Sequence, residues 1–136
     1  MNYLSIISLA LILGMSACKK EEHEHEHEET STTATITLTD PTAGDSIANA
    51  TQLTISGTIS GSNSLHGYDV EVKNITADSV VYSTSDGLHA TSYTLNYQWM
   101  NDVLITSNMT LKVKVYHDHD HTSWDEKKVL FVCKQP

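Results

Sequence analysis

The sequence contains no arginine, and its eight lysines are outnumbered by 17 acidic residues, so the 136-residue chain carries a formal net charge of −9 at pH 7. A chain this acidic, without a basic patch, is repelled by phosphate backbones. This balance excludes nucleic acid as a partner and favours small cations.

The usual catalytic motifs are also missing. The chain has no nucleophile elbow, no phosphate-binding loop and no HExxH zinc motif, and it lacks the spacing of a calcium-binding EF-hand. Its length allows one domain of ordinary size but not two. We therefore expect a single domain that is not an enzyme.

The N-terminus has one apolar run, from Leu4 to Met15, which is too short to span a bilayer but suits the centre of an export signal. Ser16 and Ala17 follow, directly before Cys18. This arrangement resembles the bacterial lipoprotein signal, which implies that residues 1–17 are a signal peptide and that Cys18 is lipidated. The alternative is a buried or membrane-spanning N-terminal helix.

Residues 18–33 are predicted to form a disordered tether, because residues 19–33 contain no apolar side chain and cannot offset the entropy of ordering. Lysine followed by acidic residues after the lipidated cysteine resembles the surface-export signal of Bacteroidota lipoproteins. That resemblance implies a lipid-anchored protein of the outer membrane, on the cell surface rather than the periplasmic face, with an outer-membrane receptor as a candidate partner. Only Cys133 then remains as a thiol, so a packed core must stabilise the domain.

From Ala34 to Pro136 the apolar residues recur with a period of two, which predicts strands. Turn signals such as Asp40-Pro41 separate seven such segments, and no helical period appears. We expect a seven-stranded antiparallel, all-β sandwich over residues 34–136. The opening ITLTDPTAGDSI and the following LTISGTIS resemble the first two strands of the Ig-like and fibronectin-III-like modules found in bacterial surface lipoproteins.

In such a sandwich three connections emerge at one end, and here they are residues 61–66, 84–91 and 117–126. They contain every histidine of the domain, and the first strand starts at the same end, where the tether enters. Extending the period of two into residues 117–121 would place its three imidazoles on one face. The candidate metal ligands are His66, His89, His117, His119 and His121, with Asp118 and Asp120 beside them and His23, His25 and His27 in the tether.

Imidazole and carboxylate donors suit divalent transition ions, and zinc is our first choice, with nickel, cobalt and copper(II) as further candidates. Copper(I) prefers sulfur and calcium prefers oxygen cages. The tether would offer many weak sites suited to capture and transfer. We therefore predict a metal-binding protein that acts as a scavenger, a buffer or an accessory to metal uptake.

Other interpretations remain open. The histidine tracts could be a plain polar loop and an acidic spacer, in which case the domain is a non-catalytic interaction module that docks to an outer-membrane partner. The His-x-His pattern is shared with copper-zinc superoxide dismutase, although the other ligands and the disulfide of that enzyme are missing. Cys133 is expected in the core. Tyr93, Tyr97 and Trp99 share a strand face and are expected in the core or on the sheet surface, with a carbohydrate platform as the alternative. Ser46 and Ser79 match the short O-glycosylation pattern of Bacteroidota.

Overall fold

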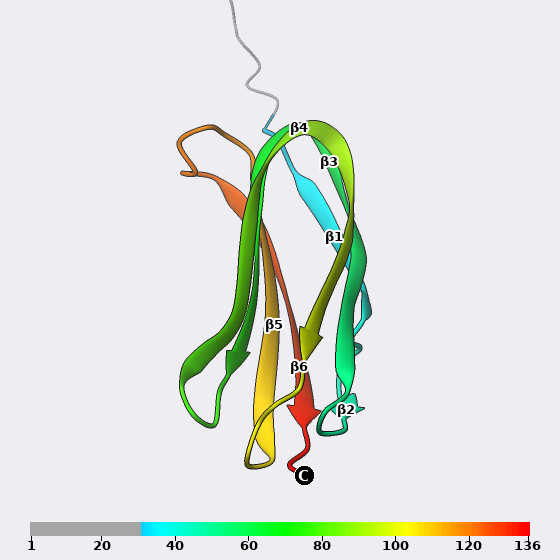
Figure 1. Cartoon of the computed structure of the whole chain (residues 1–136). Coiled ribbons are helices and arrows are strands. Elements are labelled where there is room, and N and C mark those ends of the chain that lie inside the picture. Colours follow the sequence, from blue (N-terminus) through cyan, green and yellow to red (C-terminus); the bar gives the residue numbers. More distant parts are fainter. Residues whose placement is uncertain (1–30) are drawn as a thin grey trace, which may run out of the picture.

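The computed structural model describes residues 31–136, which form the β-structure of Figure 1. Its six strands are β1 (Ala34–Asp40), β2 (Ser46–Ile47), β3 (Gln52–Asn74), β4 (Ser79–Met100), β5 (Ser107–Tyr116) and β6 (Trp124–Cys133). This part of the chain contains no helix, and accordingly none with the length and apolar character needed to cross a membrane. The predicted signal peptide, the lipidation site Cys18 and the tether histidines His23, His25 and His27 lie outside the described residues.

The two long strands β3 and β4 each run through both layers of the sandwich. Residues 52–60 of β3 pair with β1 and with residues 92–100 of β4, which makes the first layer. Residues 65–74 of β3 pair with residues 79–90 of β4 and with β5, and β6 adds to β5, which makes the second layer. In Figure 1 both long strands bend over at the same end of the molecule. The predicted all-β, Ig-like sandwich is confirmed.

The number of separate strands differs from the prediction. All seven predicted segments are strands, but four of them are halves of β3 and β4, so the connections expected at residues 61–66 and 84–91 are strand and not loop. The pairing of β3 with β4 shifts register between Ser60 and Leu65 and again before Gly67. Such bulges bend a strand without ending its pairing, which allows one hairpin to turn the corner between the layers.

The sequence also did not predict β2, a two-residue strand that pairs with β6 in parallel. It follows the cis peptide bond Asp40-Pro41. The backbone amide of Gly44 donates to the carbonyl of Leu130, and that of Val132 donates to Asp45. After β1, which pairs with β3 in the first layer, the chain crosses to the second layer and adds β2 at the free edge of β6. The other strand pairings of the described residues are all antiparallel.

The core lies between the two layers and follows the alternation seen in the sequence. Along β5, for example, the odd-numbered residues from Ser107 to Val115 are buried, and the even-numbered ones face outward or are half-buried. The largest fully buried apolar side chains come from both layers: Ile55, Ile59 and Leu95 from the first, and Leu65, Tyr68, Val70, Val72, Met109, Leu111, Val113 and Val115 from the second. This packing supplies the stability that a domain without a disulfide requires.

Candidate metal centre

The corner of the β3–β4 hairpin carries two imidazoles. His66 and His89 lie on the paired segments where Leu65 is opposite Ala90 and Gly67 is opposite Gly87. Their ring centroids are 5.8 Å apart, and the rings meet edge to face at 85°. The paired residues around His66 and His89 hold the backbone in place, and this fixes the positions from which the two side chains extend.

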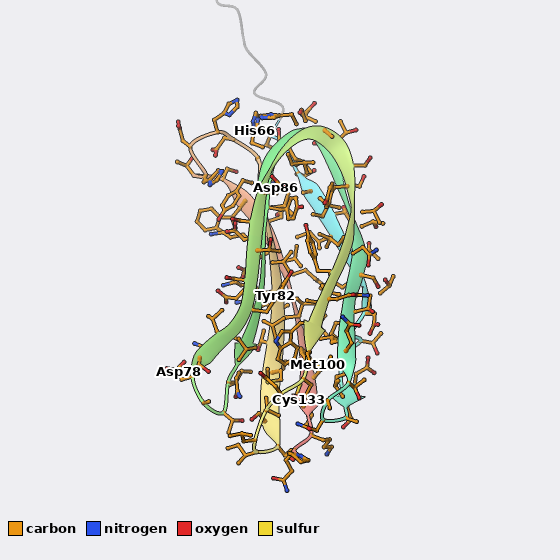
Figure 2. All side chains as sticks on the ribbon, in the orientation of Figure 1. His66, Asp78, Tyr82, Asp86, Met100 and Cys133 are labelled. Atoms are coloured by element: carbon orange, nitrogen blue, oxygen red, sulfur yellow. The ribbon has the colours of Figure 1, made fainter. Side chains whose placement is uncertain are left out.

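The connection between β5 and β6 supplies a third imidazole. The ring of His119 lies 4.0 Å from that of His66 and 5.7 Å from that of His89, measured between centroids. The three residues come from different parts of the chain and meet at one end of the sandwich, the end at which Figure 2 labels His66, opposite to Cys133. We call these three rings the imidazole cluster.

The spacing of the imidazole cluster can be compared with a zinc site. With a zinc–nitrogen distance of about 2.0–2.1 Å and tetrahedral angles, ring centroids would lie about 5 Å apart. Within residues 31–136 no group of three or more His, Cys, Asp or Glu side chains already has its donor atoms arranged to hold an ion. Convergence therefore requires the rings to turn, and His89 and His119 are exposed side chains with room to change rotamer.

His66 has an unusual environment. Its Nδ1 atom is buried, and no group in the described part of the chain hydrogen-bonds to it. Burial lowers the pKa of His66 below its usual value, and the neighbouring His119 and His89 lower it further, while Asp118 acts in the opposite direction. A neutral imidazole with an unshared nitrogen lone pair is the form that binds a metal ion.

The chain enters the domain beside the imidazole cluster, as the sequence led us to expect. The backbone amide of Ser62 donates to the carbonyl of Thr33 at 2.9 Å, and the amide of Thr33 donates to the hydroxyl of Ser62 at 3.1 Å. Ser62 lies in the β3 corner, four residues before His66. Residues N-terminal to Thr33 are thus connected to the domain at its histidine-rich end.

The tract from residue 117 to 121 does not continue β5 as a strand. β5 ends at Tyr116, and residues 117–123 form a turn in which His121 has a positive φ of 56°. The expectation that alternate imidazoles of this tract share one face is therefore wrong. The three side chains have separate surroundings, because a turn rotates successive residues in directions that the period of two does not describe.

His117 is turned toward β6 and away from the imidazole cluster. Its Nδ1 is 3.0 Å from the hydroxyl of Ser123, and its Nε2 is 3.0 Å from Oδ2 of Asp125. No pattern in the sequence indicates Asp125 as a partner of His117. The register of the β5–β6 hairpin, which places Val115 opposite Asp125, brings the carboxylate next to His117.

His121 packs on an aromatic ring. Its imidazole is stacked on Tyr116 with a centroid distance of 3.8 Å and an angle of 8° between the rings. The hydroxyl of Tyr116 in turn donates to Asp69 at 2.5 Å. His121 also lines a polar pocket of about 330 Å³ next to the cluster, together with His66, Tyr68, Asp69, Ser85, Asp86, Gly87 and Tyr116.

The two aspartates of the tract differ in role. Asp118 accepts hydrogen bonds from the backbone amide of Thr122 at 2.8 Å and from its hydroxyl at 2.5 Å, which closes the turn. These bonds lower the pKa of Asp118. Asp120 is exposed. Asp118 therefore stabilises the conformation of the turn that carries His119.

The other residues singled out in the sequence lie elsewhere. Cys133 is fully buried, which confirms it as a core residue, and burial raises its pKa to about 11. Trp99 is buried, and Tyr93 and Tyr97 are half-buried against the core, so the core interpretation holds for all three. The hydroxyls of Tyr68 and Tyr97 are hydrogen-bonded to each other.

Ser46, at the start of β2, and Ser79, at the start of β4, are exposed, and their O-glycosylation stays a prediction.

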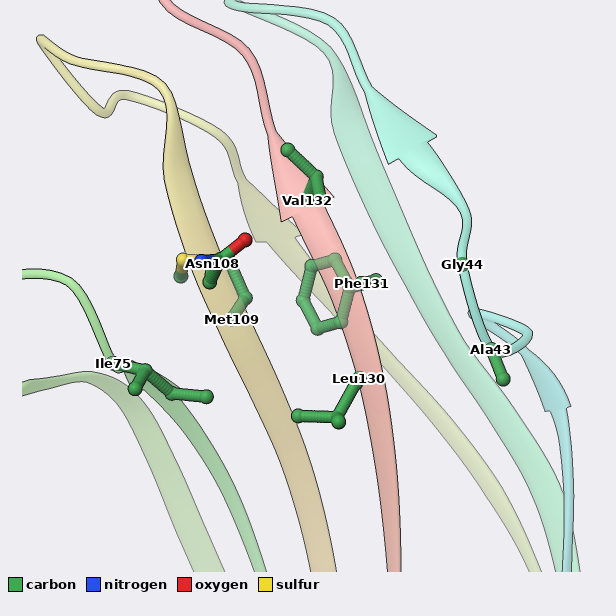
Figure 3. A pocket seen from close by; sticks show the side chains of 8 residues that line it. All are labelled: Ala43, Gly44, Ile75, Asn108, Met109, Leu130, Phe131 and Val132. Atoms are coloured by element: carbon green, nitrogen blue, oxygen red, sulfur yellow. The ribbon is translucent and has the colours of Figure 1, made fainter.

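A second hollow, of about 350 Å³, lies at the opposite end of the sandwich and is shown in Figure 3. It is lined by Ala43, Gly44, Ile75, Asn108, Met109, Leu130, Phe131 and Val132. None of these side chains is titratable, so this hollow has no donor set for a metal ion. The metal-ligand chemistry described here is confined to the other end.

Neither a protein-family profile nor a curated protein sequence matches the chain. Among solved structures, the chain is similar to a fibronectin(III)-like module of Clostridium thermocellum CbhA, with 19% identity, a TM-score of 0.48 and coverage of 74% of this chain and 96% of that one. It is also similar to self-complemented MyfA, the major subunit of Myf fimbriae from Yersinia enterocolitica, with 10% identity, a TM-score of 0.40 and coverage of 76% and 99%. At these identities the comparisons speak to the fold alone.

Proposed function

We propose that this chain is a lipid-anchored protein that binds one divalent transition metal ion through His66, His89 and His119. The observation that supports the proposal is the meeting of three imidazoles, from β3, from β4 and from the β5–β6 turn, within centroid distances of 4.0–5.8 Å. Like charges on three protonated rings at this distance would repel one another. Three neutral rings that coordinate one metal ion do not repel one another in this way.

The choice of metal follows from the donors. Three imidazoles without a thiolate suit zinc best, and nickel, cobalt and copper(II) are the competing ions. Cys133, the sole cysteine of the described residues, is in the core, as is Met109, and Figure 2 shows the exposed Met100 at the end opposite to His66. The sulfur ligands that copper(I) prefers therefore do not reach the imidazole cluster.

The remainder of the proposal rests on the sequence of residues 1–33. We propose that Cys18 carries a lipid that holds the protein in the outer membrane, facing the cell surface. His23, His25 and His27 would capture ions weakly and pass them to the domain, whose entry point at Thr33 is beside the imidazole cluster. The protein would serve as a scavenger, a buffer or an accessory to a metal-uptake receptor, and it would catalyse no reaction.

Zinc titration of the full chain in detergent tests the proposal. A parent variant in which His23, His25 and His27 are replaced by Ala removes the weak sites and leaves those of the domain. We expect this parent to bind one zinc ion per chain, and we expect His119→Ala to weaken binding at least tenfold. His121→Ala is the matched control, since its ring lies on Tyr116 and its loss should change the affinity less than threefold.

A parent variant that binds no divalent ion would contradict the metal proposal. The function that remains is a non-catalytic Ig-like module that docks to an outer-membrane partner. The apolar hollow in which Leu130 is 60% exposed and Ile75 is 46% exposed favours that second candidate.

A further inference from the structure

His117 differs from the members of the imidazole cluster because both of its ring nitrogens are already in use. Nδ1 is hydrogen-bonded to the hydroxyl of Ser123 and Nε2 to Oδ2 of Asp125, each at 3.0 Å. Its side chain is only 9% exposed, against the exposed rings of His89 and His119. A metal ligand needs a free nitrogen lone pair directed at the ion, and His117 has none to offer.

Asp125 connects His117 to the beginning of the domain. The same oxygen, Oδ2, that faces His117 also accepts the backbone amide of Ala34 at 2.7 Å. Ala34 is the first residue of β1, which otherwise pairs only with β3. A single carboxylate thus joins the start of the first strand, the second strand of the β5–β6 hairpin and the first residue of its turn.

The turn that begins at His117 is held at both ends. The backbone amide of His117 donates to the carbonyl of Ser123 at 2.9 Å, so the ring and the backbone of His117 both contact the far side of the turn. Inside the turn, Asp118 holds Thr122. His119 lies at the free tip, where its own ring is exposed and touches His66 and His89.

We infer that His117 and Asp125 are positioning residues for the metal site: they fix the turn so that His119 meets His66 and His89, and they do not bind the ion themselves. This inference rests on the proposed function. It assigns different roles, metal ligand and positioning residue, to histidines that the sequence alone does not distinguish. Without the Ser123–His117–Asp125 contacts, the turn would sample other positions, and ordering it would cost part of the binding free energy. Partners that orient a ligand in this way typically contribute a factor of about 10–100 in metal affinity.

Copper(II) binding to the parent variant, followed by titration and by electron paramagnetic resonance, tests the inference. We expect His117→Ala to lower the affinity about tenfold while the chain still binds one ion. The nitrogen hyperfine pattern should not change, because the coordinating atoms are the same. His117→Gln retains an amide donor for Asp125 and should recover most of the affinity, whereas His119→Ala should change the hyperfine pattern itself.

Ser123→Ala is a milder variant that removes only the hydroxyl bonded to Nδ1 of His117. It provides the test if His117→Ala fails to fold. We expect a three- to tenfold loss of affinity with an unchanged spectrum. Unaltered affinity in His117→Ala, or in Ser123→Ala if only that variant folds, would overturn the positioning role. A loss of nitrogen hyperfine in His117→Ala would instead make His117 a ligand and would also overturn it. If the parent binds neither copper(II) nor zinc, the proposed function fails first and this inference fails with it. If the parent binds zinc but not copper(II), the proposed function stands and the zinc affinities of the same variants decide the positioning role, so the two failures are distinguishable.

Discussion

The hydroxyl of Tyr116 donates a hydrogen bond of 2.5 Å to the carboxylate of Asp69, across the pairing of β3 with β5. This bond and the burial of the ring raise the pKa of Tyr116 to about 12. The folded state therefore favours the neutral phenol more than the unfolded state does. The resulting stabilisation is present below pH 10 and is lost as the pH rises from about 10 to 12.

Spectrophotometric titration of the phenolate band at alkaline pH checks this prediction. Tyr116→Phe should remove one tyrosine from the part of the curve near pH 12 and leave the part below pH 10 unchanged. Tyr93→Phe is the comparison, because the hydroxyls of Tyr68 and Tyr97 lower the pKa of Tyr93. A loss of amplitude below pH 10 in Tyr116→Phe would show that the bond to Asp69 does not form.

Gly57 is expected to tolerate no larger side chain. A Cβ at this position would lie 2.3 Å from the carbonyl oxygen of Thr37 in β1, and backbone cannot move aside as a flexible side chain can. Gly57→Ala should lower the free energy of unfolding by about 1–3 kcal/mol. Gly87→Ala is the control, since its Cβ would meet nothing within 4 Å. Urea denaturation that finds the two variants equally stable would contradict the close approach of β1.

Asn101 is the polar side chain with the most hydrogen bonds at the end opposite to the cluster. It is fully buried, and its amide nitrogen lies 3.0–3.2 Å from the carbonyls of Ile47, Ala48 and Lys134. Asn101→Ala removes all three contacts, although Ile47 still accepts from the backbone amide of Lys134 and Ala48 from that of Thr51, and it should cost about 2–4 kcal/mol. The exposed Asn96 on β4 provides the comparison, and Asn96→Ala should change the stability by less than about 0.5 kcal/mol in the same thermal or urea experiment.

Cys133 should be inert in the folded protein. It has no exposed surface, and its raised pKa, about 11, leaves almost no thiolate at neutral pH. In a chain that carries Cys18→Ser, a thiol reagent such as Ellman's reagent should label nothing under native conditions and one thiol in guanidinium chloride. Rapid labelling of the native protein would show that β6 opens far more readily than its pairing with β5 indicates.

The fold could be predicted because its pattern is local. Val113 and Val115 alternate with Lys112 and Lys114 in the sequence, and the structure buries the first two and leaves the others half-buried. What the pattern could not show is that the corner at residues 61–66 stays in strand. A bulge is defined by which residues of two neighbouring strands are opposite each other, and the sequence of one strand does not contain that information.

The site was predictable in part for the same reason. Alternating strand directions suffice to bring His66, His89 and the β5–β6 turn to one end. The roles within the tract were not predictable, since His117 and His119 have similar neighbours in the sequence. They differ through Ser123 and Asp125, whose approach to His117 depends on the length of the turn and the register of the hairpin.

The entry of the chain at Thr33 makes the histidine-rich end the part of the domain that is nearest, along the chain, to any attachment upstream. Thr33 is the fifteenth residue after Cys18, and a fully extended chain over fifteen steps reaches at most about 50 Å. If Cys18 is embedded in a bilayer, Thr33 and the histidine-rich end of the domain stay within about that distance of the lipid surface. The apolar hollow, which lies near the opposite end, can then be farther from the lipid surface and open to the surrounding medium.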